Sequence, residues 1–154
     1  NFLQNLSDDE LINFYPKFTI GSTLNINLPL KNIQRTLIKR QNIGSDFLIT
    51  QPLYSEEDFV NLTKLSKFSK CKIFAGIFPI KNKKTFKNLN SKIDGINRNN
   101  ILFDELKKSN EEDFLKISSK YLIKLLKKYK KDLHGVHIMT AGDISLASKI
   151  SNEV

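Results

Sequence analysis

Four short apolar segments alternate with segments of helical periodicity along the chain. They are rich in β-branched and aromatic residues and cover residues 17–26, 46–50, 72–78 and 135–139. These segments lack a strict alternation of apolar and polar positions, which is typical of strands with both faces buried. The pattern predicts a parallel α/β sheet with its strands in chain order and helices on one side.

Each predicted strand is followed by helical sequence. The predicted helices start near residues 30, 56, 83, 101, 111 and 143. We expect Ser55 to cap the second helix together with Asp58, in a relative of the capping box. Asn110 is expected to cap the longest helix, with the acidic residues 111–113 in its first turn, where negative charge favours the helix dipole.

Composition limits the kind of protein. The chain has 154 residues, of which 40% are hydrophobic, so we expect one globular domain over residues 1–154. Cys71 is its single cysteine, which excludes an internal disulfide and fits a reducing compartment such as the cytoplasm. No window approaches the roughly 20 apolar residues needed to cross a bilayer, so we expect no membrane partner.

The net charge of +9 suggests an anionic partner. The lysines are scattered, however, and the densest group, residues 127–131, falls in the last turns of a helix, where cations favour the helix dipole. Because no nucleic-acid-binding motif accompanies the charge, we favour a solvated surface over a nucleic-acid interface, and an anionic small ligand stays open.

Two other kinds of site are disfavoured. His134 and His137 have no cysteine and no nearby carboxylate pair, so hydrogen-bonded histidines fit better than a metal site, and we predict no metal. The six glycines are dispersed and form no phosphate-binding loop.

Polar residues follow the predicted strands at the ends where parallel α/β proteins place their functional groups. Asn25, Thr50, Gln51 and Thr140 hold such positions. The side chains of Thr50 and Gln51 suit two roles, either hydrogen bonds to a ligand or hydrogen bonds to loop backbone. The residues by themselves leave both interpretations open.

Three stretches resemble the second half of the methylenetetrahydrofolate reductase family. They read "GSDFLITQPLYSEEDF", "IFAGIFPI" and "GVHIMTAGD". Their threonine–glutamine pair, the later glycine–isoleucine and proline, and the final strand follow the family pattern. "FTIGSTLNI" and "IQRTLIKRQNIGSD" fit the preceding strand and helix, so the resemblance covers the chain from about Lys17.

The resemblance implies a (βα)8 barrel of the TIM type, of which this chain holds the last four βα units. It also implies a flavin, usually FAD and in some cases FMN, at the carboxyl mouth. A reduced nicotinamide would be the electron donor, and methylenetetrahydrofolate would be reduced to methyltetrahydrofolate. A complete barrel needs about 250 residues.

The family's catalytic glutamate and its aspartate near the flavin lie on the first and fourth strands and have no counterparts here. We therefore assign no catalytic residue and expect the chain alone to be inactive. We expect the first half of the barrel to be supplied by an absent segment of the protein or by a partner chain. A homo-oligomer of this chain is a further expectation. The alternative function is a non-catalytic half-barrel that assembles with a partner.

The resemblance assigns roles to individual residues. Gln51 matches the glutamine that contacts the pterin and, in turn, the nicotinamide. Leu89 falls near a position where some members place a phenylalanine against the substrate, and Thr140 is also assigned to substrate binding. Asp143 stands where many members have an arginine that contacts the folate tail.

Two further residues are assigned to the cofactor. Asn25 lies at the strand end that faces the flavin in the family. Arg40 falls where the family often has a lysine near the flavin phosphates, and it keeps the positive charge with a different donor geometry.

Overall fold

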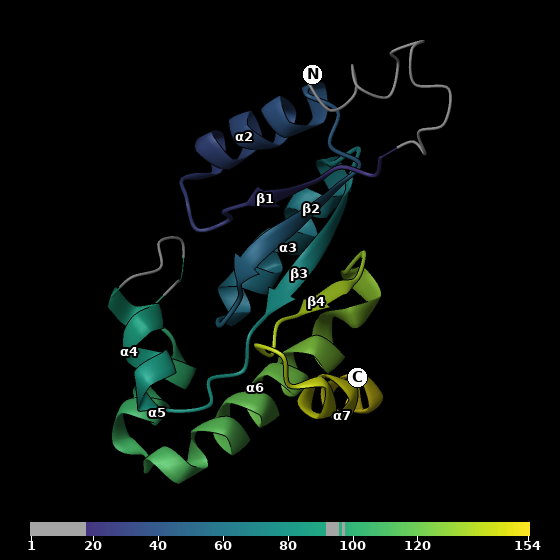
Figure 1. The fold of residues 1–154 in the computed structure, drawn as a ribbon. Coiled ribbons are helices and arrows are strands. Elements are labelled where there is room, and N and C mark those ends of the chain that lie inside the picture. The colour runs from purple at the N-terminus through teal and green to yellow at the C-terminus, as the bar shows by residue number, and fades with distance from the viewer. Residues whose placement is uncertain (1–17, 92–95, 97) are drawn as a thin grey trace.

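The core of the protein is a four-stranded parallel sheet. A computed structural model describes residues 18–91, 96 and 98–154. The strands are β1 (Gly21–Leu24), β2 (Phe47–Pro52), β3 (Lys72–Ile77) and β4 (Val136–Ile138), paired in the order β1-β2-β3-β4 (Figure 1). The predicted parallel sheet in chain order is confirmed. The first strand is shorter than predicted, and Lys17 lies outside the described residues.

The helices occupy the predicted places. Their bounds are α2 (Leu30–Asn42), α3 (Glu56–Phe68), α4 (Lys83–Ser91), α5 (Ile101–Lys108), α6 (Phe114–Tyr129) and α7 (Ile144–Glu153). The prediction for Asn110 is wrong in detail, because its side chain makes no capping hydrogen bond. Its carbonyl instead accepts from the Asp113 N–H at 3.1 Å, so the acidic residues form a 3-10 turn that precedes α6.

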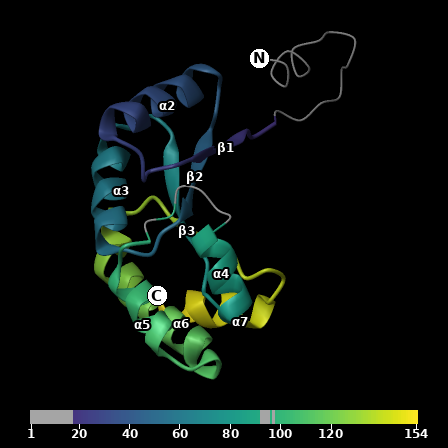
Figure 2. The ribbon, with the colours of Figure 1, turned by 90° about the vertical axis from the view of Figure 1, so that its left-hand side faces the viewer.

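The helices are not all on one side of the sheet. Figure 2 shows α2 and α3 together on one side of β1, β2 and β3, as predicted. α6 packs against α3, but α4 and α5 lie beyond the carboxyl ends of β2 and β3 in both ribbon views. The long connection between β3 and β4 therefore places helices at the sheet end where function is expected.

The two faces of the sheet are covered differently. Successive side chains of a strand point to opposite faces. Leu48, Ile73, Ala75 and Ile77 face the helices and are 0% exposed, whereas Phe47, Ile49 and Phe74 on the other face are partly exposed. We call this second face the open face.

An aromatic pair covers the open face near the amino ends of the strands. The rings of Phe47 and Phe74 lie 5.7 Å apart between centroids. Glycines make room for them, because a Cβ at Gly21 would lie 2.5 Å from the Phe47 ring and one at Gly135 would lie 2.6 Å from the Phe74 ring. The open face is thus apolar at its amino end.

One histidine supports the edge of the sheet. His134 Nδ1 accepts a hydrogen bond from the Ile73 backbone N–H at 3.0 Å, which confirms a hydrogen-bonded role for this side chain. His137 pairs with Gly76 across β3 and β4 and is exposed. Within the described part of the chain, no helix has both the length and the apolar composition needed to span a bilayer.

Candidate functional site

The end of β2 is irregular, and Thr50 stabilises it. The register between β2 and β3 shifts between Ile49 and Pro52. The Thr50 hydroxyl donates to the Gln51 carbonyl and accepts from the Gly76 N–H, both at 2.8 Å. Thr50 is 3% exposed, so this side chain satisfies backbone groups that the shifted ladder leaves unpaired. For Thr50, the structure favours the backbone interpretation.

Gly76 permits the close approach of the two strands at this point. A Cβ at Gly76 would lie 2.5 Å from the Thr50 carbonyl oxygen and 3.0 Å from the Gln51 carbonyl oxygen. Because both atoms belong to backbone, a side chain there would force the strands apart. The shape of the chain around Gln51 therefore depends on a glycine in the neighbouring strand.

Gln51 has a side-chain amide at the carboxyl edge of the sheet. It is partly exposed, whereas the preceding Thr50 is buried. Its amide makes no hydrogen bond to another residue that the structure describes. An amide offers one acceptor oxygen and two N–H donors, so both remain available for a ligand.

Asn25 follows the carboxyl end of β1, the strand that pairs with β2. Leu24 pairs with Thr50, so Asn25 and Gln51 each lie one residue beyond this last pair of the two strands. The Asn25 Oδ1 accepts from the Asn27 N–H at 2.9 Å, which shapes the turn after β1. Two of the residues assigned from the sequence thus lie at the carboxyl ends of neighbouring strands.

The loop after β3 is held from two sides. The buried Tyr54 hydroxyl donates to the Phe78 carbonyl at 2.8 Å, and burial raises the pKa of this phenol well above its usual range. The Ile80 N–H donates to Ser118 Oγ, whose hydroxyl lies 3.0 Å from the Ile80 carbonyl oxygen and can donate to it. The loop that borders the open face is therefore fixed by buried hydrogen bonds.

Asp58 fixes the chain directly after Gln51. Its Oδ2 accepts from the N–H groups of Tyr54 and Ser55 at 3.0 and 2.9 Å, while the Ser55 hydroxyl accepts from the Asp58 N–H at 3.1 Å. The predicted cap of α3 is confirmed as a full capping box. Burial raises the pKa of Asp58, against the opposite effect of the backbone donors.

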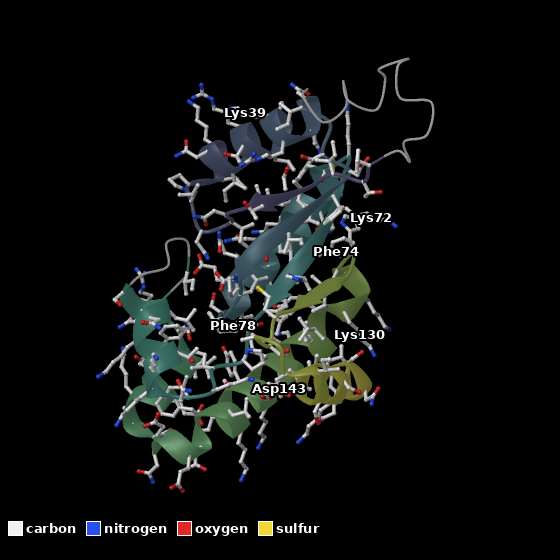
Figure 3. The ribbon with its side chains drawn as sticks, viewed as in Figure 1. Lys39, Lys72, Phe74, Phe78, Lys130 and Asp143 are labelled. Atoms are coloured by element: carbon white, nitrogen blue, oxygen red, sulfur yellow. The ribbon has the colours of Figure 1, made fainter. Side chains whose placement is uncertain are left out.

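The loop after β4 brings Asp143 to the same end of the sheet. Thr140 is 8% exposed and precedes a tight turn in which Ala141 and Gly142 have positive φ. Asp143 caps α7 by accepting from the Leu146 N–H, and its other oxygen lies 3.0 Å from Lys81 Nζ. These contacts, first the Leu146 N–H and then Lys81, lower the pKa of Asp143. Figure 3 shows Phe78 and Asp143 beyond the strand ends.

Leu89 is fully packed in this structure. It is 1% exposed on α4, in a cluster with Phe86, whose ring contacts the rings of Phe103 and Phe114. A contact between Leu89 and a substrate would require α4 to move. Its role stays a prediction.

Arg40 lies at the other end of the sheet from Gln51. Its carbonyl accepts from the Ser45 N–H just before β2, and Phe47 pairs with Gly21 at the start of β1. The four residue steps from Phe47 to Gln51 extend about 13 Å along the strand. Lys39, the preceding residue, lies on α2 far from Phe78 in Figure 3. The structure does not bring Arg40 to the other assigned residues.

A polar pocket of about 400 Å³ adjoins the Asn25 turn and was not predicted from the sequence. Its polar lining consists of Asn27, Glu57, Asn61, Arg98 and Asn99. These residues come from the β1–α2 loop, the start of α3 and the connection before α5, so no local motif links them. The only feature of the sequence that points to this pocket is that its residues follow two of the predicted strands.

The chain was compared with known proteins. A protein-family model described as Methylenetetrahydrofolate reductase matches residues 8–154. No curated protein matches the chain. The family match includes every strand of the sheet and each residue of the carboxyl edge described above.

Proposed function

Because the chain belongs to the methylenetetrahydrofolate reductase family, we propose that it forms the carboxyl-terminal βα units of a flavin-dependent reductase. The family indicates an oxidoreductase of folate-dependent one-carbon metabolism. The specific reaction proposed is the reduction of 5,10-methylenetetrahydrofolate to 5-methyltetrahydrofolate, with a reduced nicotinamide as donor. In this proposal the chain contributes ligand contacts, and the acid–base residue comes from elsewhere in the complete barrel.

The observation that carries the proposal is the free amide of Gln51. It lies at the carboxyl end of a parallel strand, next to backbone that Thr50 and Gly76 hold, and we propose that it faces the open side of the sheet near Asn25. A pterin ring presents adjacent donors and acceptors on its edge, which an amide with free N–H and C=O groups can match. The flavin, when bound, supplies the hydride chemistry, and these residues would orient the ring.

The residues at this edge suit contact with the ring end of a flavin. The phosphate contact assigned to Arg40 fits the structure less well. Ile49 offers a partly exposed apolar surface, and Asn25 and Gln51 offer polar groups above it. Arg40 is at the amino end of the sheet, so its proposed contact with flavin phosphates gains no support. The polar pocket with Arg98 places a guanidinium at the carboxyl end, and we propose it for the anionic part of the cofactor.

Completion of the barrel belongs to the same proposal. Among the described residues, β1 and β4 pair on one side only, and the open face between them carries Phe47, Ile49 and Phe74. Unpaired strand edges and an apolar face favour association. Further βα units on the same chain, or on a partner chain, would pair with both edges and cover this face.

The test uses the enzyme assembled with its remaining βα units. Gln51→Ala removes the amide, and we expect the dissociation constant for 5-methyltetrahydrofolate to rise roughly 5- to 150-fold, which corresponds to about 1–3 kcal/mol. The dissociation constant for FAD should stay unchanged. Thr23→Ala, on the neighbouring strand β1, is the matched control and should change neither dissociation constant. Normal folate binding by Gln51→Ala would overturn the assignment.

A further inference from the structure

A groove of about 800 Å³ runs between α6 and α7. The two helices lie side by side in both ribbon views. Apolar side chains line the groove, from α6 Leu115 and Ile123 and from α7 Leu146 and Ile150. The groove meets the carboxyl edge only at Asp143, so most of it is separate from the proposed ligand site.

Lysines border this apolar groove. Lys116, Lys120, Lys124 and Lys127 follow one another at helical spacing on α6, and Lys149 lies on α7. These four α6 lysines are all exposed. None of the five forms an ion pair with another residue that the structure describes. The middle of the groove is therefore positively charged.

Carboxylates stand at the two ends of the groove. Glu112 and Asp143 lie at the starts of α6 and α7, and Glu153 lies near the end of α7. The helices run in the same direction, because Lys130 Nζ, just past α6, donates to the carbonyl of Val154 just past α7. The charge pattern along the groove is thus negative, positive and negative.

We propose that this groove binds an acidic amphipathic helix of a partner protein. A helix with an apolar stripe would cover the leucine and isoleucine floor, and carboxylates beside that stripe would meet the lysines. The segment from Glu112, in the 3-10 turn before α6, to Lys127 extends about 22 Å, which fits a helix of about 15 residues. A phosphate backbone or an anionic headgroup surface would also meet the lysines, but neither would fill the apolar floor between the two helices, which disfavours these alternatives.

The probe is a fluorescein-labelled peptide of about 15 residues, with leucines at i, i+3, i+4 and i+7 spacing and glutamates on its other faces. Its binding to the chain is measured by fluorescence anisotropy. We expect saturable binding that Lys116→Glu with Lys120→Glu weakens about tenfold or more. Lys64→Glu with Lys67→Glu, the same charge change on the exposed face of α3, should leave binding unchanged. Circular dichroism of both double variants should match that of the original chain.

Several outcomes would overturn the proposal. These are the absence of saturable binding, equal binding of a scrambled peptide of the same composition, or equal weakening by the two double variants. Tighter binding of single-stranded DNA or of phosphatidylserine vesicles, lost in Lys116→Glu with Lys120→Glu, would assign the groove to phosphates. Sedimentation showing self-association that the same double variant abolishes would assign it to a second copy of the chain.

Discussion

Neighbouring residues of the same strands point to opposite faces of the four-stranded sheet, and the two faces differ in how far they are covered. On the helix side, Leu48 and Ile73 are 0% exposed, so the chain supplies everything that covers them. On the open face, Ile49 and Phe74 are partly exposed, and the side chains become polar toward Gln51. The comparison shows that the chain covers the helix side by itself, and in our proposal further strands and a ligand cover the open face.

The sharpest test of this difference compares Leu48 with Ile49. Leu48→Ala should lower the free energy of unfolding by about 2–5 kcal/mol, because it leaves a cavity among fully buried side chains. Ile49→Ala should lower it by about 1 kcal/mol or less, because the side chain is already in contact with solvent. Urea unfolding followed by circular dichroism measures both. Equal losses would show that the open face is as well packed as the helix side.

A second test concerns the backbone between Gln51 and β3. Gly76→Ala should lower the free energy of unfolding by about 1–3 kcal/mol, because its Cβ would meet the Thr50 carbonyl oxygen at 2.5 Å. Gly142→Ala is the control, since no atom lies within 4 Å of a Cβ there and only its φ of +89° opposes the change. We expect about 1 kcal/mol for this control. A neutral Gly76→Ala would mean that the strands do not approach so closely.

The smallest expected effect is a difference in pH dependence between a buried and a partly exposed carboxyl. Burial raises the pKa of Asp58, so the folded state holds its proton more strongly and the contribution of Asp58 to stability falls as pH rises above its ordinary value of 3.8. The pKa of Asp143 is lowered, so its contribution is present above that value and is lost as pH falls through its folded pKa.

Thermal unfolding between about pH 3 and pH 7 measures both effects. The melting temperature of the original chain minus that of Asp58→Asn should fall as pH rises. The corresponding difference for Asp143→Asn should rise. The same trend for both variants would contradict the difference in burial between the two sites.

The sequence predicted features that depend on neighbouring residues. The capping box of Ser55 and Asp58 is local, and the structure shows it as expected. The order of the parallel strands followed from the alternation of apolar and helical segments. Asn110 was misassigned because a 3-10 turn and a capped first turn begin with similar residues.

Features that depend on distant backbone could not be predicted. The contact between Thr50 and Gly76 joins two strands across a register shift, and no pattern in either segment specifies that shift. The polar pocket with Arg98 combines three separate segments. The position of Arg40 follows from chain topology, because a helix that returns from one parallel strand to the next ends at the amino edge of the sheet, and its contact with flavin phosphates stays a prediction.

The most direct test of the account is to map where a folate binds. Backbone amide chemical shifts of the ¹⁵N-labelled chain, assembled with its remaining βα units, would be followed during titration with 5-methyltetrahydrofolate. We predict saturable shifts in residues 25–28, 51, 53, 78, 80 and 81, which lie near the carboxyl ends of β1, β2 and β3, and smaller ones in α2 and α3. Shifts confined to the helix side, or no shifts at saturating folate, would contradict the assignment of the open face as the ligand-binding face.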